Sequence, residues 1–179
     1  MMHPQLAIIA DQFAATSARV RQLLDSLDEA RFHARRDHKR WSAAECIAHL
    51  TLTTQAYVPL IDAALGNSPA APGARHYRRD VPGWLLSTLL EPPARIRMKT
   101  ITAFVPASAG TRAAVGADFA RAQTDLVRRL ETASGRDLNH LKITSPFNAR
   151  LSYNLYSAFR ILAAHERRHV WQAERAARP

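Results

Sequence analysis

The sequence predicts an all-α protein, and three observations support this fold class. Apolar residues recur every three or four positions over several long segments, as they do along the buried face of an α-helix. A helix-start motif opens one of these segments. Most of the prolines fall within residues 67–112, which we expect to form a long crossover packed on the side of a helical bundle. With 179 residues, of which 47% are hydrophobic, we expect a single domain over residues 1–179.

The first helix is expected from Pro4 to about Leu27, because the apolar residues of this segment share one helical face. These residues are Leu6, Ile9, Phe13, Val20, Leu24 and Leu27. A polar and basic connection is expected from Arg31 to Arg40.

A capping box marks the start of the second helix. Ser42 is followed three positions later by Glu45, so each side chain can bond a backbone N–H group that the helix start would leave unpaired. Trp41 and Cys46 occupy the positions of a hydrophobic staple. We therefore expect Cys46 to be a small packed residue. The alternative is a thiol that reaches towards a metal or a thiol substrate.

The second helix should run to about Leu65, with Pro59 causing a kink or an early break. Within the crossover, a short helix is expected from Gly83 to Leu90, and Pro92-Pro93 should end it. An extended stretch from Arg95 to Pro106 should follow.

The third helix is expected from residue 113 or 117 to residue 133, closed by Gly135. Its core stripe should consist of Phe119, Leu126, Val127 and Leu130. A loop that contains Pro146 should lead to the last helix, from about Ser152 to Arg175. The apolar side of the last helix should carry Leu155, Phe159, Leu162, His165, His169 and Gln172.

The last helix contains the run H-E-R-R-H, from His165 to His169. Two histidines four positions apart lie on one helical face and can bind one metal ion. The run also fits the H-E-x-x-H zinc-protease pattern, whose third ligand lies downstream. Only ten residues follow His169, and Glu174 among them points to another side of the helix. We therefore expect Glu166 on a solvated flank beside an arginine, and the third ligand upstream.

His49 is the natural third ligand, because it lies two turns into the second helix on the face expected to point inward. Without His49, hydrogen-bonded core histidines would be the preferred interpretation of His165 and His169. Three neutral imidazoles would leave a divalent ion with open coordination positions, as in catalytic sites.

Other residues near the histidines have weaker assignments. Gln172, Tyr57 and Trp171 are candidates for a pocket wall, although aromatic residues at helical spacing more often belong to the core. Arg167 and Arg168 are expected to be solvated, with attraction of an anionic thiol cofactor as the alternative. The remaining histidines are assigned no role, and they are His3, His33, His38, His76 and His140.

The composition excludes several classes of protein. The net charge of +10 would suit a nucleic-acid binder, but the arginines are scattered and no binding motif is present, so we do not expect nucleic acid as a partner. A single cysteine excludes an intrachain disulfide and a cysteine-based zinc site. The sequence has no long apolar run and no signal-peptide pattern, so we expect a cytoplasmic protein without a membrane partner.

Several short motifs occur in an order typical of one family. Trp41-Ser42-x-x-Glu45-x-x-x-His49-Leu50 opens the second helix, and Ser145-Pro146-Phe147 precedes the last helix with His165-x-x-x-His169 and Gln172. The crossover adds Glu91-Pro92-Pro93 and Lys99-Thr100. In these features the chain resembles the DinB/YfiT-like family over nearly its whole length.

The resemblance implies a four-helix bundle, often dimeric, with a long crossover between helices 2 and 3. It also implies a divalent metal, nickel or zinc, held by His49, His165 and His169. Members of the family include thiol S-transferases and isomerases that use low-molecular-weight thiols, and metal-dependent hydrolases. The resemblance therefore implies a small-molecule substrate and a thiol co-substrate.

Two positions depart from the family pattern. Ser145 stands where many members have a histidine, and Asn148 where many have a glycine, so we expect a differently built loop near the site. Two further interpretations remain beside the metal-dependent transferase or hydrolase. One is a non-catalytic, dimeric helical protein that binds a ligand and whose histidines are vestigial or structural. The other is a basic nucleic-acid-binding module.

Overall fold

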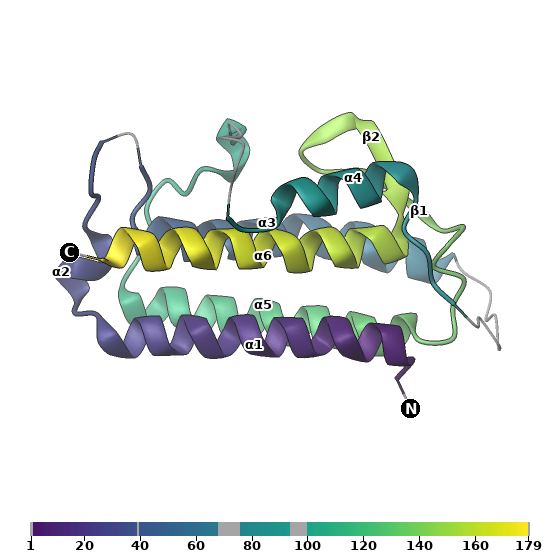
Figure 1. Cartoon of the computed structure of the whole chain (residues 1–179), viewed down its shortest axis with the longest axis horizontal. Coiled ribbons are helices and arrows are strands. Elements are labelled where there is room, and N and C mark those ends of the chain that lie inside the picture. The colour runs from purple at the N-terminus through teal and green to yellow at the C-terminus, as the bar shows by residue number, and fades with distance from the viewer. Residues whose placement is uncertain (1, 39, 68–75, 94–99, 179) are drawn as a thin grey trace.

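The computed structural model describes residues 2–38, 40–67, 76–93 and 100–178 (Figure 1). Within these ranges the chain forms six α-helices, one short 3₁₀ helix and one two-stranded antiparallel sheet. The predicted all-α class therefore fits broadly, with one small sheet that was not predicted. None of the helices in these ranges is long and apolar enough to cross a lipid bilayer.

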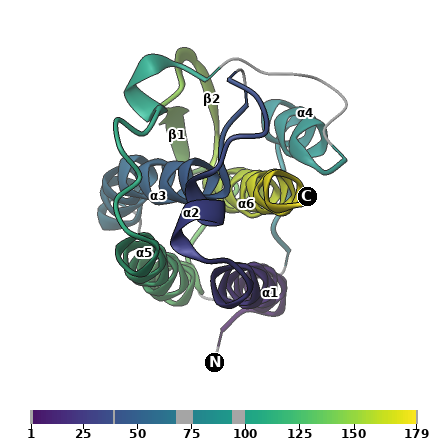
Figure 2. The same ribbon diagram turned by 90° about the vertical axis from the view of Figure 1, so that its left-hand side faces the viewer.

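Four long helices run side by side in the described part of the chain (Figures 1 and 2). They are α1 (Pro4–Ser26), α3 (Ala43–Gly66), α5 (Arg112–Ala133) and α6 (Leu155–Ala177). Helix α3 packs against α5 and α6, and α1 packs against the same two helices. Each long helix thus contacts two others and buries a face between them.

The predicted capping box at the start of α3 is confirmed. Ser42 Oγ accepts a hydrogen bond from the backbone N–H of Glu45 at 3.2 Å, and Glu45 Oε2 accepts one from the N–H of Ser42 at 2.9 Å. A kink or an early break was expected at Pro59, and of these two the break is wrong, since α3 continues to Gly66. Gln55 and Pro59 are both exposed, so the carbonyl that loses its partner at Pro59 lies on the solvent side of the helix.

Shorter elements lie in the connections. Helix α2 (Glu29–His33) forms where only a connection was expected, because Asp28 caps it by accepting from the N–H of Arg31 at 2.8 Å. Helix α4 (Val81–Leu90) matches the predicted short helix. The 3₁₀ helix η1 (Thr102–Phe104) interrupts the predicted extended stretch. The start of that stretch, with Lys99, lies outside the described residues.

A β-hairpin replaces the predicted loop before the last helix. Strand β1 (Lys142–Ser145) pairs with β2 (Asn148–Asn154), with Ile143 opposite Tyr153. The last helix begins at Leu155 and not at Ser152, because β2 occupies the preceding residues. Asn154 caps α6 by accepting from the N–H of Ser157 at 2.8 Å.

The apolar core is divided into two clusters along the helices. The first includes Phe13, Tyr57, Leu126 and Ala164. The second includes Val20, Leu50, Phe119 and Val170. Between the clusters, each long helix contributes buried polar side chains, among them Thr16, Thr53, Gln123 and Glu166. The three predicted metal ligands are also buried, so the fold places them inside the helix assembly.

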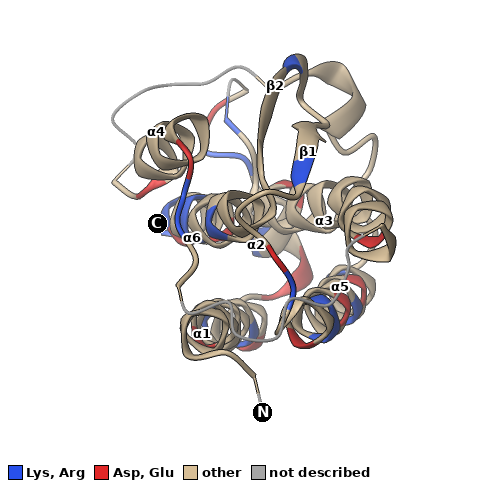
Figure 3. Cartoon of the chain, turned by 90° about the vertical axis from the view of Figure 1, so that its right-hand side faces the viewer, with Lys and Arg blue, Asp and Glu red and all other residues tan. Residues whose placement is uncertain are grey.

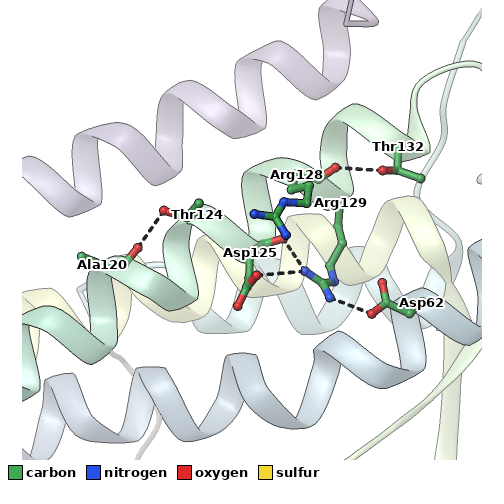
Figure 4. A network of polar contacts seen from close by, with 7 residues as sticks. All are labelled: Asp62, Ala120, Thr124, Asp125, Arg128, Arg129 and Thr132. Carbon is green, nitrogen blue, oxygen red and sulfur yellow. Dashed lines mark hydrogen bonds and ion pairs between the residues drawn. The ribbon is translucent and has the colours of Figure 1, made fainter.

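Ion pairs on the surface also join the long helices. Arg129 of α5 donates to the Asp62 carboxylate of α3 at 2.6 Å and to the backbone oxygen of Asp125 at 2.8 Å (Figure 4). Such exposed pairs contribute at most about 1 kcal/mol each, so burial of the apolar faces provides most of the stability of this contact.

Candidate metal centre

The structure brings together His49 of α3 with His165 and His169 of α6. One ring nitrogen from each histidine lies within 4.8 Å of the other two. All three side chains are buried, with relative exposures of 1%, 8% and 8%. The capping box fixes the start of α3 and hence the face on which His49 lies, whereas the spacing of four residues places the other two on one face of α6.

The distance between two of these nitrogens suits one ion. His49 Nε2 lies 3.2 Å from His165 Nε2. Two imidazole nitrogens that bind one tetrahedral ion at about 2.0–2.1 Å stand roughly 3.3 Å apart. The observed separation is therefore compatible with an ion that both histidines contact.

Burial keeps the three imidazoles neutral. It lowers the pKa of His49, although the hydrogen bond to the Phe104 carbonyl partly opposes this shift. It also holds the pKa values of His165 and His169 well below the ordinary range, and the neighbouring histidines add to the effect. A neutral imidazole has a lone pair available for a metal, so these shifts favour binding at neutral pH.

Hydrogen bonding orients one of the three ligands. His49 Nδ1 donates to the backbone oxygen of Phe104 at 2.7 Å, which leaves the Nε2 lone pair directed to His165. The Nδ1 atoms of His165 and His169 are buried without a hydrogen-bond partner among the described residues. Buried polar atoms without partners are uncommon in proteins, so the described residues leave the polar groups of this cluster incompletely satisfied. The residues present therefore fit a divalent ion.

Aromatic rings from three connections cover the histidines. Trp41 precedes α3, Phe104 ends η1 and Phe147 lies in the hairpin turn. The ring centroids of Trp41 and His49 are 4.9 Å apart, and those of Phe147 and His165 are 5.9 Å apart. Phe104 and Phe147 contact each other at 4.2 Å. Figure 2 shows η1 and the hairpin on the side of α3 and α6 away from α1 and α5.

Sequence reasoning missed the contribution of this aromatic cover. Phe104 and Phe147 had no assigned role, and Trp41 was expected only to pack at a helix start. The carbonyl of Phe104 orients His49 across 55 positions of the chain, which local spacing does not reveal. The Ser145-Pro146-Phe147 motif was the available signal for the hairpin ring.

The expectation for Glu166 is wrong. This residue is 1% exposed, and its Oε1 accepts a hydrogen bond from Gln123 Nε2 of α5 at 2.6 Å. Burial raises the pKa of Glu166 to about 8, although the Gln123 bond opposes the shift. The other carboxyl oxygen, Oε2, has no hydrogen-bond partner in the described part of the chain. Glu166 is thus a core residue whose raised pKa favours the protonated carboxyl at neutral pH.

The solvated position expected for Arg168 is also wrong. Arg168 is 4% exposed and donates to the backbone oxygen of Leu89 at 3.2 Å, because α4 covers this side of α6. Arg167 is partly exposed and donates to the Glu91 carboxylate, with one bond of 3.0 Å. Neither arginine lies on an uncovered face of α6.

The remaining candidates divide between the core and the surface. Tyr57 is buried and its hydroxyl bonds that of Tyr153, whereas its ring lies 6.3 Å from Phe147. The Gln172 side chain lies near His169 and partly opposes the lowering of the His169 pKa. Trp171 packs against Arg175, with 4.9 Å from the guanidinium carbon to the ring centre, and does not belong to the aromatic cover.

Cys46 behaves as the packed residue that was expected. It is 1% exposed and belongs to the same apolar cluster that Trp41 contacts. Burial raises the pKa of its thiol to about 12, so it holds its proton at neutral pH. Glu174 binds Arg19 on the surface, with bonds of 2.7 and 2.8 Å, which agrees with its exclusion as a ligand.

The hairpin shows the two departures from the family pattern. Ser145 is buried, and its hydroxyl accepts from the N–H of Phe147 at 3.3 Å. Asn148 is exposed, and its side chain accepts from the N–H of Arg150 at 3.0 Å. The serine thus supports the turn that carries Phe147 over the histidines.

Together, the fold and the site define a helical protein with a buried three-histidine cluster suited to a divalent ion. Residues 12–173 match the family model of the DinB superfamily, and the chain belongs to this family. The matched span includes all three histidines and the aromatic cover. No curated protein and no solved structure matches the chain.

Proposed function

We propose that this protein is a divalent-metal-dependent enzyme that acts on a small molecule, with His49, His165 and His169 as the metal ligands. The observation that carries the proposal is the convergence of three neutral imidazole nitrogens within 4.8 Å inside the fold. Membership of the DinB superfamily supports it. The proposal extends to the architecture: a single domain in which the four long helices form a four-helix bundle with a long crossover between α3 and α5.

An ion at this site, nickel or zinc, would act as a Lewis acid towards a water molecule or a thiol. The protein's own contribution is positional. The Phe104 carbonyl fixes the tautomer of His49, and burial keeps all three ligands unprotonated. Trp41, Phe104 and Phe147 limit the access of water to the histidines. These features suit thiol S-transfer with a low-molecular-weight thiol and also hydrolysis, and both reactions are part of the proposal.

A second candidate function is a non-catalytic, dimeric ligand-binding protein with a structural histidine cluster. The close cover of the histidines favours it, since Trp41 and His169 stack at 5.8 Å and the rings of Phe104 and His49 meet edge-on at 6.5 Å. A substrate would have to displace part of this cover. We also propose that the protein forms a homodimer and is located in the cytoplasm.

The first experiment measures metal content by mass spectrometry on protein purified without a histidine tag. We expect about one equivalent of nickel or zinc in the wild type and none in His49→Ala or His165→Ala. His140→Ala is the matched control, because this exposed histidine binds only Asp137 among the described residues. Absence of metal after reconstitution with several divalent ions would overturn the three-histidine site.

Activity then separates the two functions. If the protein is an enzyme, it should show metal-dependent turnover of thiol or hydrolysable substrates, and His49→Ala should abolish this turnover. If it is a ligand-binding protein, its affinity for the ligand should survive this substitution. Steeply salt-dependent association with DNA or RNA would contradict both candidates and favour a nucleic-acid-binding module.

A further inference from the structure

A second concave site lies between the segment 76–80, the start of α4 and the first half of α6. This cavity has a volume of about 490 Å³. The residues that line it include three arginines, Arg78, Arg79 and Arg160, and one aspartate, Asp80. None of the three histidines of the candidate metal centre lines it. Figure 3 shows basic residues on the segment that enters α4 and on the neighbouring α6.

The positive charge of this cavity is only partly offset within the described residues, because three arginines meet one aspartate. Asp80 accepts from the backbone N–H groups of Gly83 at 3.1 Å and Asn154 at 2.7 Å, and from the Ser157 hydroxyl at 2.8 Å. All three donors are neutral, and no ion pair joins Asp80 to an arginine in the described part of the chain. Arg79 donates to a neutral acceptor, the Ser87 hydroxyl, at 3.0 Å.

Arg78 and Arg160 have even fewer interactions. Neither guanidinium forms a hydrogen bond or ion pair with another described residue, and Arg160 is partly buried. Partial burial reduces the hydration of a charge and strengthens its interaction with an opposite charge. Three cations around one cavity, beside a single carboxylate that is already satisfied, therefore favour an anionic ligand.

The wall that carries Arg78 and Arg79 is held rigidly. Side chains from distant parts of the chain bond its backbone: Gln5 to Tyr77, Asn139 and Asn154 to Arg78, and Ser157 to Asp80. The distances of these bonds lie between 2.7 and 3.1 Å. A wall fixed in this way loses little conformational freedom when a ligand binds, which favours affinity.

An aromatic surface borders the same cavity. Trp84 lines it and is 52% exposed, although indole rings are usually largely covered in folded proteins. Tyr156 of α6 also lines it. Rings of this kind provide a flat apolar surface next to the cationic groups.

We infer that this cavity binds a small organic anion, a carboxylate or a phosphate monoester with a flat apolar group. The anionic group meets Arg78, Arg79 and Arg160, because charge-assisted bonds from guanidinium groups suit both carboxylate and phosphate oxygens. The apolar group lies against Trp84. The inference is independent of the proposed metal chemistry, since no residue is shared between the two sites.

Calorimetric titration of the full chain with phenyl phosphate and with benzoate tests the inference, and it distinguishes the two kinds of anion. We expect at least one of them to bind with a stoichiometry of one, and neutral benzyl alcohol to show no binding. Arg78→Gln and Arg160→Gln should each weaken binding about tenfold or more, because a charge-assisted bond is lost. Arg160→Lys retains the charge and should weaken it less.

Two controls make the outcome decisive. Arg128→Gln removes an exposed arginine of α5 that lies outside this cavity, and it should leave the affinity unchanged. His49→Ala should also leave it unchanged. The inference is overturned if neither anion binds, if all three glutamine variants behave alike, or if His49→Ala abolishes binding. Far-ultraviolet circular dichroism and melting temperatures verify that each variant is folded.

Discussion

The Nε2 atoms of His49 and His165 face each other at 3.2 Å across the contact between α3 and α6. Without an ion between them, one nitrogen must donate a hydrogen to the other. Since His49 Nδ1 donates to Phe104, His49 Nε2 is the acceptor and His165 Nε2 carries the hydrogen. Metal binding through His165 Nε2 therefore requires the other tautomer, with the hydrogen on an Nδ1 atom that has no partner among the described residues.

Divalent metal should stabilise the folded protein, because an ion that binds only the native state shifts the unfolding equilibrium. At a free concentration of 100 times Kd the effect is about 2.7 kcal/mol, which corresponds to an increase of roughly 5–10 °C in melting temperature for a chain of this size. We expect this increase with nickel or zinc in the wild type and in His140→Ala. Thermal unfolding should show no increase in His165→Ala.

The same stabilisation should change little between pH 8 and pH 6.5. Three histidines with ordinary pKa values would each be half protonated at pH 6.5, and proton competition would weaken metal binding roughly eightfold. The lowered pKa values of His49, His165 and His169 reduce this competition. An affinity loss of eightfold or more over this range, measured by metal titration, would contradict the neutral cluster.

Cys46 should be unreactive in the folded protein. Its side chain is buried and its pKa is raised to about 12, so the reactive thiolate is scarce at pH 8. Iodoacetamide should modify the single cysteine fully in urea and only marginally in native buffer, as measured by intact mass. Rapid modification of the native protein would show that the thiol reaches the surface, as the alternative role near a substrate requires.

Helix boundaries could be predicted well where local rules determine them. The Ser42–Glu45 capping box located the start of α3, and Gly135, with a φ of 79°, follows the end of α5 as a glycine in the left-handed region commonly does. The hairpin could not be predicted in this way. Strand β1 has four residues, and its pairing of Ile143 with Tyr153 depends on a register that short apolar alternation does not reveal.

The histidine pair of α6 followed from helical spacing, but the environment of α6 did not. Glu166 and Arg168 were expected on a solvated flank because a surface helix has one polar side. Helix α6 instead packs against α1, α3 and α4, so it has little solvated surface at this level. Which sides of a helix are covered depends on the tertiary arrangement, and α4 reaches its position only through the long crossover.

Gly83 should be required for the docking of α4 on α6. A Cβ atom at this position would overlap the Ser157 side chain and lie 2.7 Å from Asp80 Oδ1. We expect Gly83→Ala to lower the free energy of unfolding by about 1–3 kcal/mol, as overpacked substitutions do. Gly66→Ala is the matched control, because a Cβ there would contact nothing within 4 Å. Equal stability of the two variants in urea denaturation would refute this account of the contact.

Glu166→Gln should stabilise the protein at neutral pH. The pKa of Glu166 is about 8 in the native state and 4.5 for an ordinary glutamic acid. Between these values the native state holds a proton that the unfolded chain has released, so the wild type loses stability as pH rises from about 4.5 towards 8. Glutamine has nearly the same shape, does not ionise in either state, and keeps an oxygen that can accept from Gln123.

The wild type loses about 1.4 kcal/mol of unfolding free energy for each pH unit above 4.5. The expected gain in stability of Glu166→Gln over the wild type is therefore small near pH 5 and on the order of 3 kcal/mol at pH 7. Urea denaturation of both proteins at pH 5, 6 and 7, with a chelator present so that metal occupancy stays constant, measures it. Glu174→Gln is the control, because the Glu174 side chain is partly exposed and pairs with Arg19 on the surface. This variant should show no gain in stability that grows with pH. A stability difference between Glu166→Gln and the wild type that did not increase with pH would contradict this account, because Glu166 would then have to be ionised in the core. Among the described residues, no cation pairs with its carboxylate to support that state.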